Sequence, residues 1–515
     1  MLGRIARTLL ALVGALTLVA GLAAAVVVGP DDDVLLPATR PDAEPGQLVV
    51  SAPDLLSYDD LTVVVRARAD GGVLLAAGNP VDVSSLADQA DHWEVTGLRF
   101  GGVTGGRRVA AAHDPVPLGD LSSAELWTER AEGAGWQELR LDLHGQPLQL
   151  LAQPTGGAVP ELQVGVHVGG LFWLLVAVAA GGAALLGLAV ALMVRRRGGR
   201  SRAAGLLVPM LALATVATGC GVPQHVDAEP ASRVALEPDD LAALAAAYDE
   251  HNNRAIRAAA APRYAIGPWR TVDTGPVLEH DVYDTIVARR AKERDEPRAF
   301  THTPTGVYSP RFTSYPMWSL VVFEEKHAAE VDVFTRATAA SPWLMRTTSA
   351  ADPDDLPEPI DDPGRMQAVD PGTIDAARTA VGAVTRYVAT GTLRGVGVTE
   401  TVRELHRWAT RVLPDDRRYI DSQHATIDSA AESRQDDLRV VAAEGGHLAV
   451  AVRPLRVTSY PRDELEVGWQ SAFRTVHGRF GQSLYRDFNL CLVVFLPEDG
   501  GTPRAVAASA LPAPV

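Results

Sequence analysis

The sequence is short of cysteine, lysine and positive charge, and each shortage excludes a class of protein. Only two of its 515 residues are cysteines, Cys220 and Cys491, which excludes a disulfide scaffold and a four-cysteine zinc site. The formal net charge of −16 argues against a nucleic-acid partner, because binding to phosphate backbones requires a basic face. Only Lys292 and Lys326 are lysines, so arginine carries almost all of the positive charge.

Apolar residues are abundant and gather in three long blocks. The first, residues 5–28, has Arg7 as its only charge and is long enough to cross about 30 Å of hydrocarbon as a helix. Arg4 and Arg7 mark its start and three aspartates follow it, which predicts a cytoplasmic N-terminal end. A cleaved signal peptide shares this pattern, but the apolar core is long for one, so we favour a retained helix.

The second block, residues 168–194, contains 27 residues without a charge and predicts a second transmembrane helix. Small residues at 181–184 could pack against another helix. Five arginines follow within residues 195–202, which predicts a short cytoplasmic loop there and a helix that runs from outside to inside.

The third block, residues 203–220, is short for a span, and Pro209 would kink it. Its basic start, short apolar core and small residues before Cys220 resemble a bacterial lipoprotein signal, the lipobox, although Ala217 stands where that motif prefers leucine. The resemblance implies lipidation of Cys220 and cleavage before it. The alternative is a plain third transmembrane helix, and both interpretations place the rest of the chain outside the cytoplasm.

Residues 29–165 predict a β-rich domain outside the cytoplasm. Residues 138–143 alternate strictly between polar and apolar, as a half-buried strand does, and residues 61–65 and 73–76 are short apolar runs between turn signals. We expect a small β-sandwich or barrel.

Residues 221–515 predict an α+β domain. Amphipathic or apolar segments indicate helices near 241–256, 275–294, 374–390 and 400–412, and strands near 319–323, 331–338, 438–443, 448–457 and 490–496. A Pro- and Asp-rich segment, residues 351–371, predicts a solvated linker between two halves, residues 221–350 and 372–515. Residues 490–495 resemble 320–323, and Thr-Ser-Tyr-Pro occurs at both 313–316 and 458–461, which suggests that the halves are related.

Short motifs in this segment resemble an uncharacterised domain of actinobacterial exported proteins. They are the run from Tyr248 to Ala255, which contains Asn-Asn-Arg-Ala, then Thr274-Gly275, and Tyr315-Pro316-Met317-Trp318 at the start of a strand. The resemblance covers about residues 235–500, and the family has no assigned chemistry. Two halves of this kind are also similar to the cystatin-like and NTF2-like group, whose cones hold ligands or serve as scaffolds.

A search for catalytic motifs finds no zinc-protease helix, no nucleophile elbow and no Walker loop, so we expect no enzyme, no cofactor and no metal. The weak candidates for ligand binding are Asn252, Asn253 and Arg254. The Asn252 amide could either face a ligand or pin the helix to the sheet by hydrogen bonds. We expect a membrane-anchored envelope protein whose non-catalytic binding or scaffold domains lie on the outer face of the cell membrane. Its expected partners are the lipid bilayer and an envelope protein or small molecule. The alternative is an extracytoplasmic hydrolase with a dispersed active site.

Overall fold

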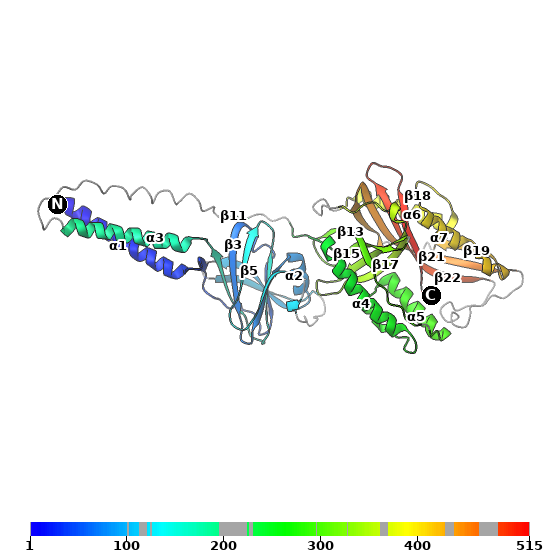
Figure 1. Cartoon of the computed structure of the whole chain (residues 1–515), viewed down its shortest axis with the longest axis horizontal. Coiled ribbons are helices and arrows are strands. Elements are labelled where there is room, and N and C mark those ends of the chain that lie inside the picture. The colour runs from blue at the N-terminus through cyan, green and yellow to red at the C-terminus, as the bar shows by residue number, and fades with distance from the viewer. Residues whose placement is uncertain are drawn as a thin grey trace. The chain divides into compact units, whose positions relative to one another are not determined.

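The computed structural model describes residues 2–99, 102–112, 121–123, 126–194, 224–225, 230–294, 296–326, 328–360, 369–427, 437–462 and 483–513. The chain forms two compact units, Met1–Ala231 and Ser232–Val515, and each is described by itself (Figure 1). The predicted cytoplasmic loop 195–202 and the third apolar block with Cys220 lie outside the described residues.

The first unit consists of two long helices and a β-rich body, as the sequence predicts. Its helices are α1 (Leu2–Val28), α2 (Pro80–Ala87) and α3 (Leu171–Val194), with a 3-10 turn at Leu121–Ser123. Its strands are β1 (Asp33–Leu35), β2 (Leu48–Ser51), β3 (Tyr58–Arg68), β4 (Val73–Gly78), β5 (His92–Arg99), β6 (Gly102–Val109), β7 (Trp127–Gly133), β8 (Gln137–His144), β9 (Gln149–Pro154), β10 (Glu161–His167) and β11 (Gln224–His225).

The strands build two sheets that share one core. One sheet has the order β1-β10-β3-β11, with β8 on the other side of β3, and the second has the order β6-β5-β2-β9-β4-β7. Buried side chains of both sheets form a single cluster, among them Val65 and Leu141 from the first and Leu75 and Ala152 from the second. The body is therefore a β-sandwich, one of the two architectures that the sequence predicts.

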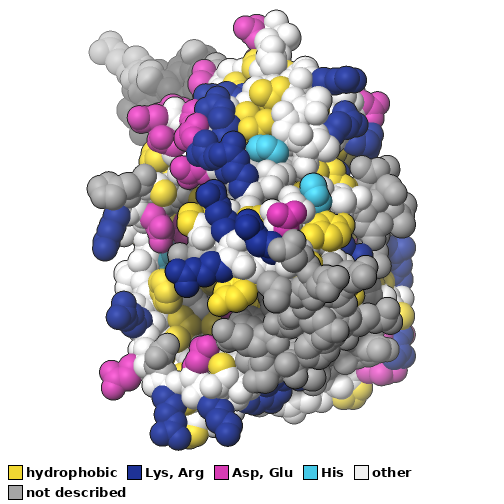
Figure 2. Space-filling model, turned by 90° about the vertical axis from the view of Figure 1, so that its right-hand side faces the viewer, with side chains coloured by type: hydrophobic (Ala, Val, Ile, Leu, Met, Phe, Trp, Pro, Cys, Tyr) yellow, Lys and Arg dark blue, Asp and Glu magenta, His cyan; other side chains and the backbone are white. Residues whose placement is uncertain are grey.

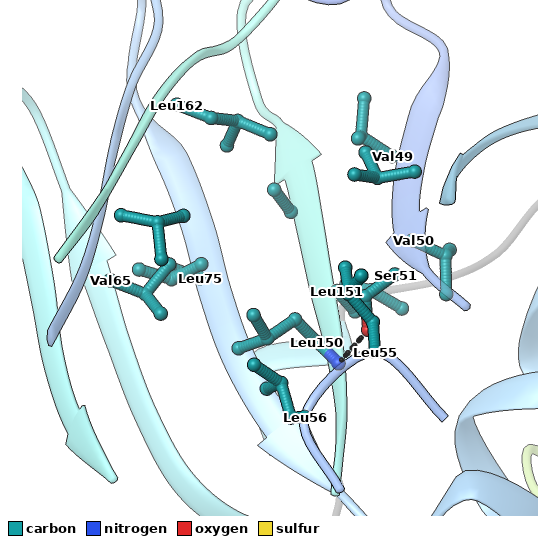
Figure 3. A pocket seen from close by; sticks show the side chains of 13 residues that line it. Val49, Val50, Ser51, Leu55, Leu56, Val65, Leu75, Leu150, Leu151 and Leu162 are labelled. Atoms are coloured by element: carbon teal, nitrogen blue, oxygen red, sulfur yellow. Dashed lines mark hydrogen bonds between the residues drawn. The ribbon is translucent and has the colours of Figure 1, made fainter. Parts of the chain in front are cut away.

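A narrow cavity between the sheets belongs to this core. It is lined almost entirely by aliphatic side chains, and the Ser51 hydroxyl accepts a hydrogen bond from the Leu150 backbone N–H at 2.9 Å (Figure 3). Because no charged group lines it, the cavity offers packing surface and no polar chemistry.

The two long helices pack against each other through their smallest residues. Gly14, Gly21 and Ala25 of α1 and Ala179, Gly182 and Ala189 of α3 are buried. A Cβ atom on Gly14 would lie only 2.7 Å from the backbone nitrogen of Leu186, so the backbones approach closely. Of the predicted small residues at 181–184, only Gly182 is buried at this contact, and α1 and α3 lie side by side in Figure 1.

The large side chains of the same helices point outward. Leu16 is 66% exposed and Trp173 is 71% exposed, and both helices are long and apolar enough to span a membrane. An apolar surface of this kind is stable in contact with hydrocarbon rather than water.

The aspartates between α1 and β1 fasten the helices to the sandwich. The Asp32 carboxylate accepts hydrogen bonds from the backbone N–H groups of Phe172 and Gly170, at 2.7 and 2.8 Å, and these bonds lower the pKa of Asp32. Asp33 is buried, and its carboxylate lies 2.9 Å from the Arg140 guanidinium and 3.0 Å from His167 Nδ1. Sequence reasoning used these residues only as a charge signal, but in the fold they are structural contacts.

In the residues that the structure describes, the second unit contains four helices, several short 3-10 turns, one large sheet and a separate two-stranded sheet formed by residues 233–234 and 311–312. Its helices are α4 (Leu241–Ala259), α5 (Gly275–Ala291), α6 (Pro371–Thr390) and α7 (Glu400–Thr410), and its 3-10 turns are Pro238–Asp240, Gly267–Thr271, Pro353–Asp355 and Pro414–Arg418. Its strands are β12 (Arg233–Val234), β13 (Thr303–Tyr308), β14 (Arg311–Phe312), β15 (Met317–Glu325), β16 (Ala328–Arg336), β17 (Leu344–Ala351), β18 (Gly397–Val398), β19 (Ile420–Ile427), β20 (Arg439–Ala443), β21 (Gly446–Pro461), β22 (Leu484–Pro497) and β23 (Arg504–Pro512).

The strands on either side of the predicted linker belong to one ten-stranded sheet. Its order is β13-β15-β16-β17-β23-β22-β21-β19, with β18 beside β23 and β20 beside β21. Helices α4 and α5 pack on one part of the sheet, and α6 and α7 pack on another. A third core, which includes Val331 from the first set of strands and Val450 from the second, joins the two sets. The two sets of elements are thus parts of one compact unit.

The predicted linker is partly packed, which corrects the expectation of a solvated segment. Asp355 accepts a hydrogen bond from Arg504 at 2.7 Å, and the Glu358 carbonyl accepts one from the Glu444 N–H at 2.9 Å. Leu356 packs against the core that joins the two sets of strands. The prolines and aspartates of this segment do not prevent packing, because the Asp355 carboxylate and the Glu358 carbonyl both accept hydrogen bonds from later parts of the unit. Residues 361–368 lie outside the description.

The short sequence repeats do not mark equivalent places. Each set ends in three consecutive antiparallel strands, β15-β16-β17 and β21-β22-β23. Residues 320–323 lie in the first strand of one set, whereas residues 490–495 lie in the second strand of the other. The two Thr-Ser-Tyr-Pro sequences precede β15 and end β21. Apolar runs are typical of any central strand, so their similarity does not demonstrate a duplication.

Candidate functional site

The polar run from Tyr248 to Arg254 lies on α4 and holds the chain that enters β13. The Asn253 amide donates to the Phe300 carbonyl and accepts from the Phe300 N–H, both at 2.8 Å. One oxygen of the Asp249 carboxylate accepts from the His302 N–H at 2.9 Å, and the other oxygen contacts the His302 ring. Asn253 and Asp249 therefore act as a clamp between helix and sheet.

The other two candidates of this run have different surroundings. Asn252 is buried on the inward face of α4. Arg254 is exposed and forms an ion pair with Glu250, one helical turn earlier, at 2.6 Å. An exposed pair of this kind contributes little to stability. The three candidates thus lie on different faces of the helix and do not converge on one ligand.

A cluster of buried acids lies beneath α4, and sequence reasoning did not find it. Asp273 precedes α5 and is 1% exposed, while Asp332 on β16 is fully buried. The Tyr248 hydroxyl lies 3.4 Å from the Asp273 carboxylate and 3.4 Å from the Met345 sulfur. Within the described residues, neither oxygen of Asp332 has a hydrogen-bond partner that meets geometric criteria.

Burial changes the protonation of these carboxyl groups. Burial and the neighbouring Asp281 carboxylate raise the pKa of Asp273 to about 9, and burial raises the pKa of Asp281 to about 6. Burial also raises the pKa of Asp332 well above its usual value. At neutral pH the two neighbours therefore share one proton, which Asp273 holds.

An open groove of about 830 Å³ lies where α6 and α7 end beside β19. Its charged side chains are Arg411, Arg417, Arg462 and Asp421, and we call it the arginine groove. None of the three guanidiniums forms an ion pair with a carboxylate among the residues that the structure describes. Figure 2 shows basic side chains (dark blue) gathered in a band on the face of the second unit that carries α7 and β19, with histidines beside the band.

The floor of the arginine groove is held in place by its own hydrogen bonds. The Gln423 amide donates to the carbonyls of Trp408 and Ala409, at 2.8 and 3.1 Å, and so binds the last turn of α7. His406 Nδ1 lies 2.9 Å from the Val388 carbonyl near the end of α6, and the His424 ring contacts the Tyr460 ring edge-on. The polar groups of the groove therefore sit on helix ends and a strand.

The sequence profile of a family described as "Domain of unknown function (DUF8094)" matches residues 233–504. The chain belongs to this family. No curated protein and no solved structure matches the sequence.

The matched range covers almost all of the second unit, so the DUF8094 domain comprises α4–α7 and the strands of the ten-stranded sheet except β23, which begins where the match ends. The sequence analysis placed an uncharacterised domain at about residues 235–500, which agrees with this range. The lipidation candidate, Cys220, precedes the DUF8094 domain and lies outside the described residues. Cys491 is buried within β22, and burial raises its pKa to about 12, so it is an unreactive core thiol.

The residues of the arginine groove were not predicted from the sequence, because they do not form a recognisable motif. The three arginines are separated by 6 and 45 positions, and each resembles a solvated surface residue. Only the meeting of α6, α7 and β19 brings them together.

Proposed function

We propose that this protein is anchored in a membrane by α1 and α3 and presents the β-sandwich and the DUF8094 domain on the extracytoplasmic face as non-catalytic binding or scaffold domains. The observation that carries the proposal is the arrangement of α1 and α3. Their small residues pack together, their large apolar residues face outward, and both helices meet the sandwich at the same end, through Asp32. Arg4 and Arg7 in the first two turns of α1 and the arginines at 195–202 support a cytoplasmic location for the opposite ends.

Strand β11 supports a third crossing. Strand β10 leaves β3 at His167, where the chain turns into α3, and β11 then pairs with the remaining residues of β3, Tyr58 and Asp59. Helix α3 extends about 36 Å from this end of the sandwich, at 1.5 Å per residue. The described chain ends there at Val194 and resumes at Gln224, which pairs with β3 in the sandwich. If α3 crosses a bilayer, the segment between them crosses it as well.

Accessibility of engineered cysteines tests this topology. Asp70→Cys in the sandwich and Glu296→Cys in the DUF8094 domain replace exposed residues. We expect both to react with a membrane-impermeant maleimide added to intact cells, because both units lie outside. The parent protein provides the background from its own cysteines. Protection of Asp70→Cys or Glu296→Cys until the cells are lysed would contradict the shared location.

We further propose that Cys220 is a lipid attachment site, as the resemblance of the preceding segment to a lipobox implies. Cleavage before Cys220 would give an N-terminal product with α1, α3 and the sandwich, and a lipid-anchored DUF8094 domain. The parent is then expected to migrate as two bands and to incorporate labelled palmitate. A Cys220→Ser variant should remain full-length and unlabelled. A single unlabelled full-length band for both proteins would show that the segment is a plain third helix.

The alternative function is an extracytoplasmic hydrolase, for which the carboxyl pair of Asp273 and Asp281 is the nearest approach to paired acid–base groups. Asp273 is only 1% exposed, so a substrate bond could not reach it without opening the domain. The raised pKa values follow from burial as such. We therefore favour the non-catalytic role.

A further inference from the structure

We propose that the arginine groove of the DUF8094 domain is a binding site for a phosphate-bearing ligand. The inference deepens the proposed binding role, since it assigns a ligand class to that domain. It does not depend on how the chain is anchored. Three arginines, Arg411, Arg417 and Arg462, line this one groove, although the whole chain carries a net charge of −16.

The balance of charge in the groove favours an anion. Asp421 is the only carboxylate among the described lining residues. The carboxyl ends of α6 and α7 also face the groove, and each contributes about half a negative charge that fades within one turn. The three positive charges of the guanidiniums exceed the summed negative charge of Asp421 and the two helix ends. His406 and His424 carry no negative charge and therefore do not oppose an anion.

The geometry of the donors favours phosphate among anions. A guanidinium presents a planar fork of N–H groups that matches two oxygens of a phosphate or a carboxylate. A single carboxylate has two oxygens and one charge, so it could engage only part of this set. A terminal phosphate offers three oxygens and up to two charges, and a diphosphate offers more, which suits three arginines around an open groove.

Hydrogen bonds hold several side chains of the groove in fixed positions, as expected for a preorganised binding site. Gln423 is fixed by the end of α7 and also accepts a hydrogen bond from the Ser459 hydroxyl at 3.3 Å. His406 is fixed by the Val388 carbonyl. Tyr460, which contacts His424, is 41% exposed and offers an aromatic surface to the remainder of a ligand. Ordered supporting groups reduce the entropy that a ligand must remove on binding.

Calorimetric titration of the full chain in an uncharged detergent, with inorganic pyrophosphate as the probe, tests the proposal. Saturable binding is expected, and Arg417→Gln or Arg462→Gln is expected to weaken it roughly tenfold, because each removes a charge-assisted pair of hydrogen bonds. Arg418→Gln is the matched control: it removes the same charge from an exposed neighbour that does not line the groove, and should change affinity less than twofold. Circular dichroism confirms that each variant is folded.

A second arm distinguishes the source of the phosphate. The full chain in phosphatidylcholine nanodiscs is mixed with vesicles that contain phosphatidylglycerol. Binding of pyrophosphate that depends on Arg417 supports a soluble ligand, and binding only to the vesicles with the same dependence supports a lipid headgroup. The proposal is overturned if neither probe binds, or if Arg418→Gln weakens binding as much as Arg417→Gln. Failure here would leave the maleimide result, and hence the proposed topology, unchanged.

Discussion

Replacing Asp273 by asparagine is expected to stabilise the DUF8094 domain at alkaline pH and to flatten its dependence on pH. Burial and the Asp281 carboxylate raise the pKa of Asp273 to about 9, far above the usual value of 3.8. A group with a raised pKa in the folded state stabilises the fold fully below its unfolded pKa, and this stability is lost as pH rises towards the folded pKa. The wild-type domain should therefore lose stability between about pH 4 and pH 9.

Asparagine reproduces the charge of the protonated form at every pH, because its amide is neutral and has nearly the same shape as the acid. Between pH 6 and pH 9 we expect the variant to gain about 2–4 kcal/mol relative to wild type, since each unit of pKa corresponds to about 1.4 kcal/mol. For a domain of this size that is roughly 5–10 °C in Tm. Thermal unfolding of the full chain, followed by tryptophan fluorescence at several pH values, measures the difference.

The control for this experiment is Asp375→Asn. Asp375 is 76% exposed on α6 and pairs with Arg378, its one ion-pair partner among the described residues, so its removal should shift Tm equally at pH 6 and pH 9. If Asp273→Asn lowers Tm by the same amount at both pH values, Asp273 is ionised in the folded domain and its carboxylate is stabilising. That result would contradict the shared proton.

Substitution of Gly182 by leucine is expected to separate α1 from α3. A Cβ on Gly182 would lie 2.9 Å from the Gly14 carbonyl oxygen and still closer to the backbone of Leu18, so no side chain fits between the helices. Overpacking of this kind costs about 3 kcal/mol or more when backbones must move apart. In a bilayer the pair has no hydrophobic effect to hold it, because lipid is as apolar as leucine, and depends on this close contact.

Gly187→Leu provides a matched control on the same helix. Apart from the backbone of α3 itself, no heavy atom of the described residues lies within 4 Å of a Cβ at Gly187, so the substitution gives the same change in helix propensity without the clash. Energy transfer between fluorophores at Arg7→Cys and Val194→Cys, measured as SDS is added, reports separation of the helices. We expect Gly182→Leu to separate at much lower SDS than wild type and Gly187→Leu to behave as wild type. Equal behaviour of the two variants would show that the glycine contact does not hold the pair.

The sequence by itself determined the features that depend on local composition. The apolar runs at residues 5–28 and 168–194 predicted α1 and α3, because length and hydrophobicity suffice to indicate a long apolar helix. The spacing of apolar residues along the chain also predicted several elements of the second unit, because this spacing differs between helices and strands. They are the helices α4–α7 and the central strands β15, β20, β21 and β22. Strands β13, β17, β19 and β23 were missed, because shorter or more polar runs become strands only when a neighbour supplies their hydrogen bonds.

Only the tertiary structure decided which residues meet. Asp273 and Asp332 are 59 positions apart, and their raised pKa values arise because helix and sheet exclude water from both. The predicted linker became part of one packed unit because strands on both sides of it share a sheet and a core. The arginine groove exists because two helices end beside β19 and direct distant arginines to one place. Charge and burial act through distances in space, and a single sequence specifies those distances only through the completed fold.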